Sequence, residues 1–166
     1  MRSSMRRSGV MAVVATLAAA HTCLRAQSAE LRLKPGTVIE RHIEGTASDK
    51  MRILLSVNQF LRLDVEQKGS DLAVRLSDPQ GTALMDADSG NENYGPETIV
   101  AIAGQAGVYA LEVKIGGGAP SGDYTLQVRE LRPVQANDAA LVAAFRDYYE
   151  GTALQGDGKW DAAERN

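Results

Sequence analysis

Residues 86–93 (DADSGNEN) form a run of oxygen-bearing side chains interrupted by one alanine, Ala87, and one glycine, Gly90. Carboxylate and amide oxygens at alternate positions can wrap a hard cation such as calcium. With Asp86 at position one of a calcium loop, Glu97 falls at position twelve, but the glycine falls fifth instead of sixth. The pattern therefore leaves two interpretations open, a solvated loop or a calcium site, and no other cofactor is expected. The ligands of the calcium site would be Asp86, Asp88, Asn91 and Glu92.

The chain has only two histidines and one cysteine, so few residues could support histidine or cysteine catalysis or a zinc site. Cys23, the only cysteine, and His21 lie within the first 26 residues, so His42 is the one histidine of the remaining chain. A lone histidine cannot close a zinc site, and the chain has no G-x-S-x-G nucleophile elbow. We therefore expect His42 at the surface, and we predict no catalytic residue and no enzyme activity in this chain.

Paired carboxylates on strands could in principle flank a glycosidic bond. The candidates are Glu40, Glu44, Asp64 and Glu66. Aromatic platforms for a sugar are scarce, because Tyr109 and Tyr124 sit in alternating strand patterns typical of structural residues. Solvated strand faces are the favoured interpretation of these carboxylates.

The first 26 residues resemble a secretory signal peptide. Arg2, Arg6 and Arg7 precede the apolar run VMAVVATLAAA, and Ala26 supplies a small residue before the expected cut. This run is short for a bilayer, which needs roughly 20 apolar residues, although an uncleaved anchor is an alternative. We therefore expect export, to the periplasm or the extracellular space, and no membrane span after the leader.

Charge and cysteine content narrow the possible partners. The chain has 18 basic and 21 acidic residues; the leader holds four arginines and no acids, so the remainder has 14 basic and 21 acidic, a net charge of −7. An acidic exported domain is a poor candidate for binding nucleic acid. Without a cysteine pair, stability must come from a packed core instead of disulfides.

The chain between Leu31 and Arg132 has the pattern of an antiparallel β-sandwich. Short runs with period-two alternation are separated by turn residues such as Asp78-Pro79-Gln80-Gly81 and Gly116-Gly117-Gly118. Strands are predicted at 37–43, 51–56, 60–67, 72–77, 82–85, 97–103, 108–115 and 124–130. About eight strands at this spacing predict a mainly β, jelly-roll-like fold.

The pattern changes to helical after Pro133. Asn137 or Asp138 can cap a helix over residues 139–154, and a second helix is predicted at 160–165 after the break at 156–158. The first helix carries an apolar stripe that would be exposed unless more helices followed it. We therefore expect the stripe to bind a protein partner or downstream domains. The expected interaction residues are Leu141, Phe145, Tyr148 and Trp160.

Residues 27–132 resemble the bacterial pre-peptidase C-terminal (PPC) domain. The resemblance rests on LSDPQG at 76–81, AGVYALEV at 106–113 and SGDYTLQV at 121–128, with the Asp-rich loop after Met85. It implies a jelly-roll-like sandwich that serves as an accessory module of a secreted protein and has no catalytic residues of its own.

Residues 133–166 resemble the opening of a tetratricopeptide repeat. Gly151, Gly158, Trp160 and Ala163 fall at positions that match this repeat. One incomplete copy cannot bury a continuous core, so the resemblance implies a longer protein. The order leader, sandwich, repeats is similar to exported bacterial scaffolds that end in a caspase-like CHAT domain.

We interpret the chain as a non-catalytic binding or scaffolding module of an exported bacterial cell-envelope protein, placed before a helical repeat array. Two alternatives remain open. The chain could be an accessory part of an enzyme whose protease-like catalytic domain lies beyond Asn166, or a calcium-stabilised carbohydrate binder.

Overall fold

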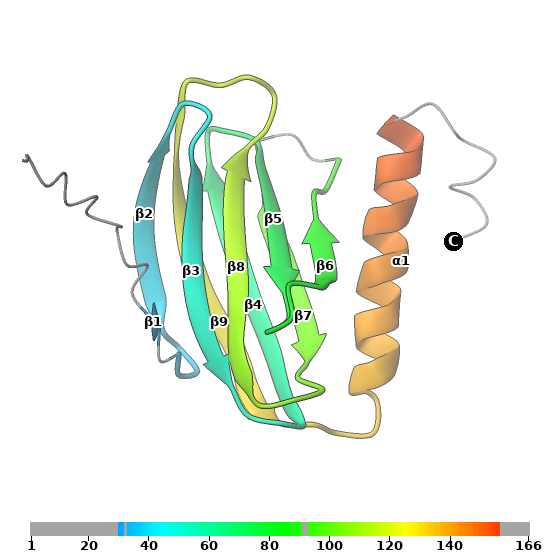
Figure 1. Cartoon of the computed structure of the whole chain (residues 1–166). Coiled ribbons are helices and arrows are strands. Elements are labelled where there is room, and N and C mark those ends of the chain that lie inside the picture. The colour runs from blue at the N-terminus through cyan, green and yellow to red at the C-terminus, as the bar shows by residue number, and fades with distance from the viewer. Residues whose placement is uncertain (1–29, 32, 91–92, 157–166) are drawn as a thin grey trace, which may run out of the picture.

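In the described part of the computed structural model, two β-sheets face each other and one helix lies along one side of them (Figure 1). The structure describes residues 30–31, 33–90 and 93–156. The mainly β sandwich expected from the strand pattern is confirmed.

The first sheet has five strands in the order β1-β3-β8-β5-β6 and the second has four in the order β2-β9-β4-β7. All pairs are antiparallel except β1 with β3. The first sheet contains β1 (Glu30–Leu31), β3 (Ser48–Leu55), β5 (Leu72–Ser77), β6 (Ala83–Ala87) and β8 (Gly107–Ile115). The second contains β2 (Val38–Glu44), β4 (Gln59–Lys68), β7 (Pro96–Ile102) and β9 (Ser121–Pro133).

The core lies between the inner faces of the two sheets, and the period-two pattern supplies it. In β5, for example, Leu72, Val74 and Leu76 are buried and Arg75 is exposed. Tyr109 and Tyr124 are fully buried there. Their hydroxyls donate to the carbonyl of Gln105 (2.9 Å) and to Asp49 Oδ2 (2.7 Å), which confirms that both tyrosines are structural.

The predicted turn at residues 78–81 joins β5 to β6. The carboxylate oxygen Oδ1 of Asp78 accepts the backbone N–H groups of Gln80 (2.9 Å) and Thr82 (2.8 Å). Gly81 has a φ of 87°, which a residue with a Cβ rarely adopts. This Asp-Pro-x-Gly turn therefore has the local chemistry that its sequence indicates.

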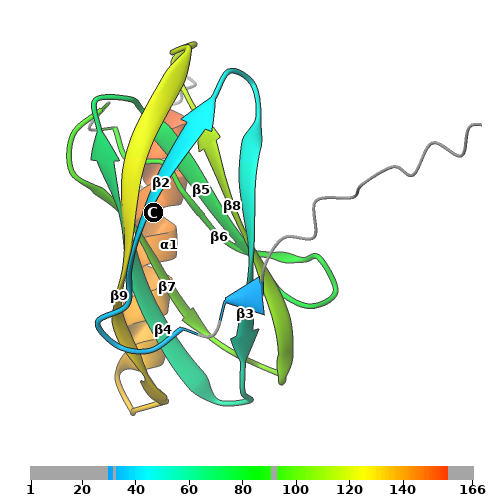
Figure 2. The same ribbon diagram turned by 90° about the vertical axis from the view of Figure 1, so that its left-hand side faces the viewer.

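The helix α1 (Asp138–Gly156) packs against β7 and β6, so it covers the edges of both sheets on one side of the sandwich. Figure 2 shows the two sheets face to face with the helix behind them. The expectation that the whole apolar stripe is exposed is wrong for Leu141 and Phe145, because both are half-buried against the core. The helix folds back on its own sandwich.

One further difference concerns an element bound. Strand β6 continues to Ala87, so Asp86 lies on a strand and not in the loop after Met85. The expected helix at 160–165 falls outside the described residues. Within the described part of the chain, no helix has the length and apolar character needed to cross a bilayer.

Candidate interaction surfaces

Tyr149 anchors α1 to the sandwich. Its side chain is 6 % exposed, and its hydroxyl accepts the N–H of Thr98 (2.9 Å) and donates to the carbonyl of the same residue (3.0 Å). Thr98 lies on β7, an edge strand whose outward backbone groups have no neighbouring strand. Burial raises the pKa of the Tyr149 hydroxyl well above its ordinary value, so it stays a donor at physiological pH.

Tyr148, the neighbour of Tyr149 on α1, is exposed to solvent and not buried against the sandwich. Its ring meets that of Tyr149 edge-on, with centroids 5.2 Å apart, and half of the side chain is exposed. Of the four expected interaction residues, Tyr148 is thus accessible, Leu141 and Phe145 face the sandwich, and Trp160 lies outside the described residues.

Arg132 and Asp138 tie the start of α1 to the end of β9. The guanidinium donates two parallel bonds, Nη1 to Oδ2 at 2.7 Å and Nη2 to Oδ1 at 2.9 Å, and it also stacks over the ring of Phe60 at 4.4 Å. Asp138 accepts the N–H of Gln135 as well (2.6 Å). Its carboxylate therefore fixes the entry to the helix, and the bond from Arg132 lowers the pKa of that carboxyl.

Glu97 is a fully buried carboxylate on β7 that binds Ser89, at the start of the acidic loop. It accepts the hydroxyl of Ser89 (2.6 Å), the backbone N–H of Ser89 (2.9 Å) and Nε2 of Gln67 (3.2 Å). Gln67 in turn accepts the N–H of Leu72 on the facing sheet (2.6 Å). Burial raises the pKa of Glu97 despite the bonds from Ser89.

The candidate calcium ligands are only partly described. Asp86 pairs with Arg75 on the outer face of the five-stranded sheet, and Asp88 has a pKa raised by burial. Asn91 and Glu92 lie outside the described residues. Within residues 33–90 and 93–156, no three His, Cys, Asp or Glu side chains come together to hold a metal ion. The calcium site stays a prediction.

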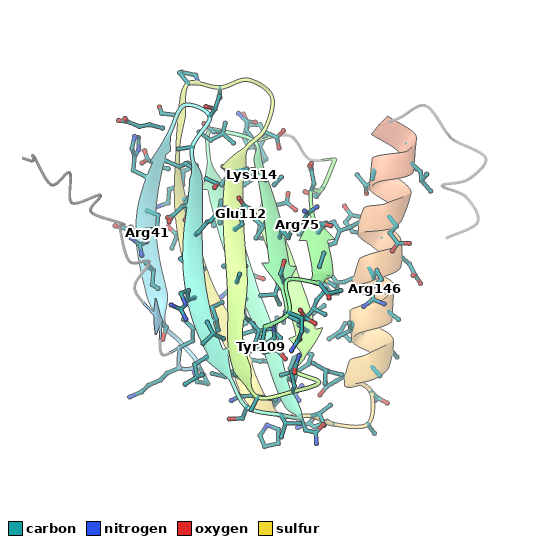
Figure 3. All side chains as sticks on the ribbon, viewed as in Figure 1. Arg41, Arg75, Tyr109, Glu112, Lys114 and Arg146 are labelled. Carbon is teal, nitrogen blue, oxygen red and sulfur yellow. The ribbon has the colours of Figure 1, made fainter. Side chains whose placement is uncertain are left out.

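A row of alternating charges crosses the outer face of the five-stranded sheet (Figure 3). Lys50, Glu112, Arg75 and Asp86 stand in register on β3, β8, β5 and β6. Lys50 lies 3.3 Å and Lys114 lies 3.5 Å from the Glu112 carboxylate. Burial acts to raise the pKa of Glu112, but hydrogen bonds and the two lysines hold it below its ordinary value.

A groove of about 470 Å³ runs between this face and α1. Its apolar part includes Leu84 and Met85 on β6 and Ala153 on α1, and Arg146 and Asp88 add charge. Arg146 forms no hydrogen bond or ion pair with any residue that the structure describes. Arg75, by contrast, is paired with Asp86. Figure 3 shows Arg146 on the helix that forms one wall of the groove.

The residues considered for catalysis are spread apart or already bonded. His42 is exposed on β2, with Nδ1 2.7 Å from Asp123 Oδ1 and Nε2 3.6 Å from Glu44 Oε1. Asp64 is buried between Thr98 Oγ1 (2.9 Å) and Arg129 Nε (2.6 Å). The expectation of a solvated strand face is therefore wrong for Asp64, because Thr98 and Arg129 enclose its carboxylate and leave only 6 % of the residue exposed.

Sequence reasoning missed Tyr149, Glu97 as a buried anchor, and Arg146. Tyr149 lies one position after Tyr148, the aromatic expected to bind a partner, and helical spacing from Leu141 and Phe145 places position 149 on the same face as those two residues. Nothing in the sequence marks Arg146, because its lack of a partner depends on how the helix packs.

Comparison with protein-family models and with curated proteins finds no match. Among solved structures, the chain is similar to Aeromonas hydrophila PliG, a periplasmic lysozyme inhibitor of g-type lysozyme, at 11% identity and a TM-score of 0.52, over 63% of this chain and 96% of PliG. It is also similar to the pre-peptidase C-terminal domain of Bacillus anthracis collagenase at 18% identity and a TM-score of 0.47, over 61% of this chain and 95% of that domain. The likeness to PliG shows a shared β-sandwich fold.

Proposed function

We propose that this chain is a non-catalytic protein-binding module of an exported protein. The observation that carries the proposal is the groove beside α1, where Arg146 has no partner among the described residues and apolar side chains lie close by. Arginine and aromatic residues contribute most often to binding hot spots. The exposed ring of Tyr148 on the same helix adds a second contact of this kind.

The fold and the sequence support this role. PliG, which shares the sandwich, is described as an inhibitor of g-type lysozyme. The first 26 residues resemble a leader for export, and the PPC-like phrases at 106–113 and 121–128 favour an accessory module. The same phrases support a second candidate, in which the module serves a larger protease-like enzyme. The repeat-like residues after 150 would then continue into the rest of that protein.

A photo-crosslinking amino acid tests the proposal in the whole protein in its native host. Placed at Ala153, it lies in the groove; placed at Ala110, it lies exposed on the outer face of β8. We expect a discrete protein adduct at position 153, absent at position 110 and lost in the Arg146→Glu variant. Equal adducts at both positions, or none at 153, would contradict binding in the groove.

A second assay addresses the identity of the partner. Purified g-type lysozyme is titrated with the chain while its lytic activity is measured. Inhibition that disappears in Arg146→Glu would identify lysozyme as a partner of the groove. Unchanged activity would exclude this lysozyme and leave the crosslinking result to decide the binding role.

A further inference from the structure

One long sheet edge has no cover in the described part of the chain. In the four-stranded sheet, β7 is covered by α1, whereas β2 forms the opposite edge and pairs only with β9. β2 is seven residues long, and the corresponding edge strand of the other sheet, β1, has two. Figure 1 shows β2 on the side of the molecule opposite to α1.

The register of β2 identifies the backbone groups at this edge. Gly45 donates to Pro120 (2.6 Å), and Thr37 accepts from Val128 (2.9 Å), so odd-numbered residues exchange hydrogen bonds with β9. Alternate residues of an antiparallel strand turn both backbone groups to opposite neighbours. The N–H and carbonyl groups of residues 38, 40, 42 and 44 therefore point away from the sheet.

The side chains of β2 are nearly symmetric about Arg41. Ile39 and Ile43 lie on the inner side, while Glu40 and His42 are exposed on the outer face. We propose that two copies of this chain pair through β2, antiparallel and centred on Arg41, to form one continuous eight-stranded sheet. In that register Glu40 faces His42 of the second copy twice, and Ile39 faces Ile43 of the second copy twice.

Charge complementarity selects a second copy as the occupant. Glu40 and His42 attract each other across the strands, and the Asp123 carboxylate 2.7 Å from His42 favours the charged imidazole. The two arginines at the centre repel, but Asp49 Oδ2 lies 3.8 Å from Arg41 Nε in each copy and offsets that charge. A strand that complements itself gives a closed two-fold dimer.

Sedimentation of the full chain over a range of concentrations tests the dimer. Glu40→Pro removes an outward N–H that takes no part in the β9 ladder, and Glu40→Ala keeps it while removing the same carboxylate. We expect Glu40→Pro to weaken dimerisation about tenfold more than Glu40→Ala does, since two hydrogen bonds are lost per dimer. Circular dichroism checks that both variants fold. A wild-type chain that is monomeric throughout overturns the proposal.

Cysteine crosslinking tests the register in a Cys23→Ser background. In the proposed dimer, position 41 of one copy lies opposite position 41 of the second copy, in a non-hydrogen-bonded pair. The Cα atoms of such a pair are about 4.5 Å apart, so Arg41→Cys should form a disulfide between the copies. Val38→Cys faces Glu44 of the second copy and should not crosslink. Crosslinking by Val38→Cys alone, or equally by both variants, overturns the proposed pairing. The groove experiment at Ala153 is independent, because it probes the opposite side of the sandwich.

Discussion

The hydroxyl of Tyr149 binds both backbone polar groups of Thr98, at 2.9 Å from its nitrogen and 3.0 Å from its oxygen. One side chain from the helix thus replaces a neighbouring strand at this point of β7. The next outward N–H of that strand, from Val100, lies 3.5 Å from Met85 Sδ. The outward groups of Thr98 and the outward N–H of Val100 are therefore satisfied by the helix and by the facing sheet, so α1 is an integral part of the fold.

Replacing Tyr149 with phenylalanine tests this relationship. The change keeps the ring but leaves the N–H and carbonyl of Thr98 without their partner in a buried position. We expect the free energy of unfolding to fall by about 1–3 kcal/mol, the usual cost of unsatisfied buried polar groups. Urea denaturation followed by circular dichroism measures the change.

Tyr148→Phe is the matched control, since it removes the same hydroxyl from the neighbouring residue, which is 50 % exposed. A surface change of this kind should stay within about 0.5 kcal/mol. Equal losses in the two variants would contradict the role assigned to the Tyr149 hydroxyl.

Glu97 predicts a pH dependence of stability. Because its pKa is raised in the folded state, the folded protein binds this proton more tightly than the unfolded chain does. Its contribution is fully present below the unfolded pKa of about 4.3 and is lost as pH rises through the folded value. The stability of the wild type relative to Glu97→Gln should therefore fall as pH rises from about 4 to 7.

Urea denaturation of both proteins across that pH range measures the difference. Glu66→Gln serves as the control, because it removes an exposed carboxylate from the neighbouring strand β4. A difference between wild type and Glu97→Gln that does not vary with pH would show that the burial of Glu97 does not affect its proton binding.

The strand positions could be predicted because they depend on local pattern. Alternation in residues 60–67 places Leu61, Leu63 and Val65 on the inner face, and all three are fully buried. The outer face departs from this rule, since Phe60 is also fully buried there, under the guanidinium of Arg132. Alternation cannot show that contact, because the two residues are far apart in sequence.

The packing of α1 could not be predicted for a similar reason. A helix with apolar residues on one face can pack on its own domain or on a partner, and its sequence pattern is the same in both cases. The helix packs on its own domain because β7 is an edge strand with outward backbone groups to satisfy. That can be recognised only once the order of the strands in the sheet is known. The acidic loop could not be interpreted from its sequence for the same reason. Its carboxylates alone suggested calcium, whereas the hydrogen bonds between Ser89 and Glu97 depend on how the strands pack.

We expect the contributions of Arg132 and Asp138 to the free energy of unfolding to depend on each other, because their side chains share two parallel hydrogen bonds. Arg132→Lys keeps the charge but loses the bidentate geometry, so we expect a lower melting temperature. Arg52→Lys, at an exposed position of β3, is the control. Because the pKa of Asp138 is lowered in the folded state, its contribution is present above about pH 4 and is lost as pH falls through the folded value. A double-mutant cycle with Asp138→Asn that shows no coupling would contradict this pairing.

The calcium prediction has a direct thermodynamic test. A site that binds only the folded chain with a dissociation constant of about 10 μM would add about 2.7 kcal/mol of stability at about 1 mM calcium. Thermal melts of the full chain in calcium and in chelator measure the shift, and Asp88→Asn should abolish it. Arg75→Ala is informative as well, because it releases Asp86 from its ion pair and should strengthen calcium binding. Identical melts in calcium and in chelator would contradict the calcium site.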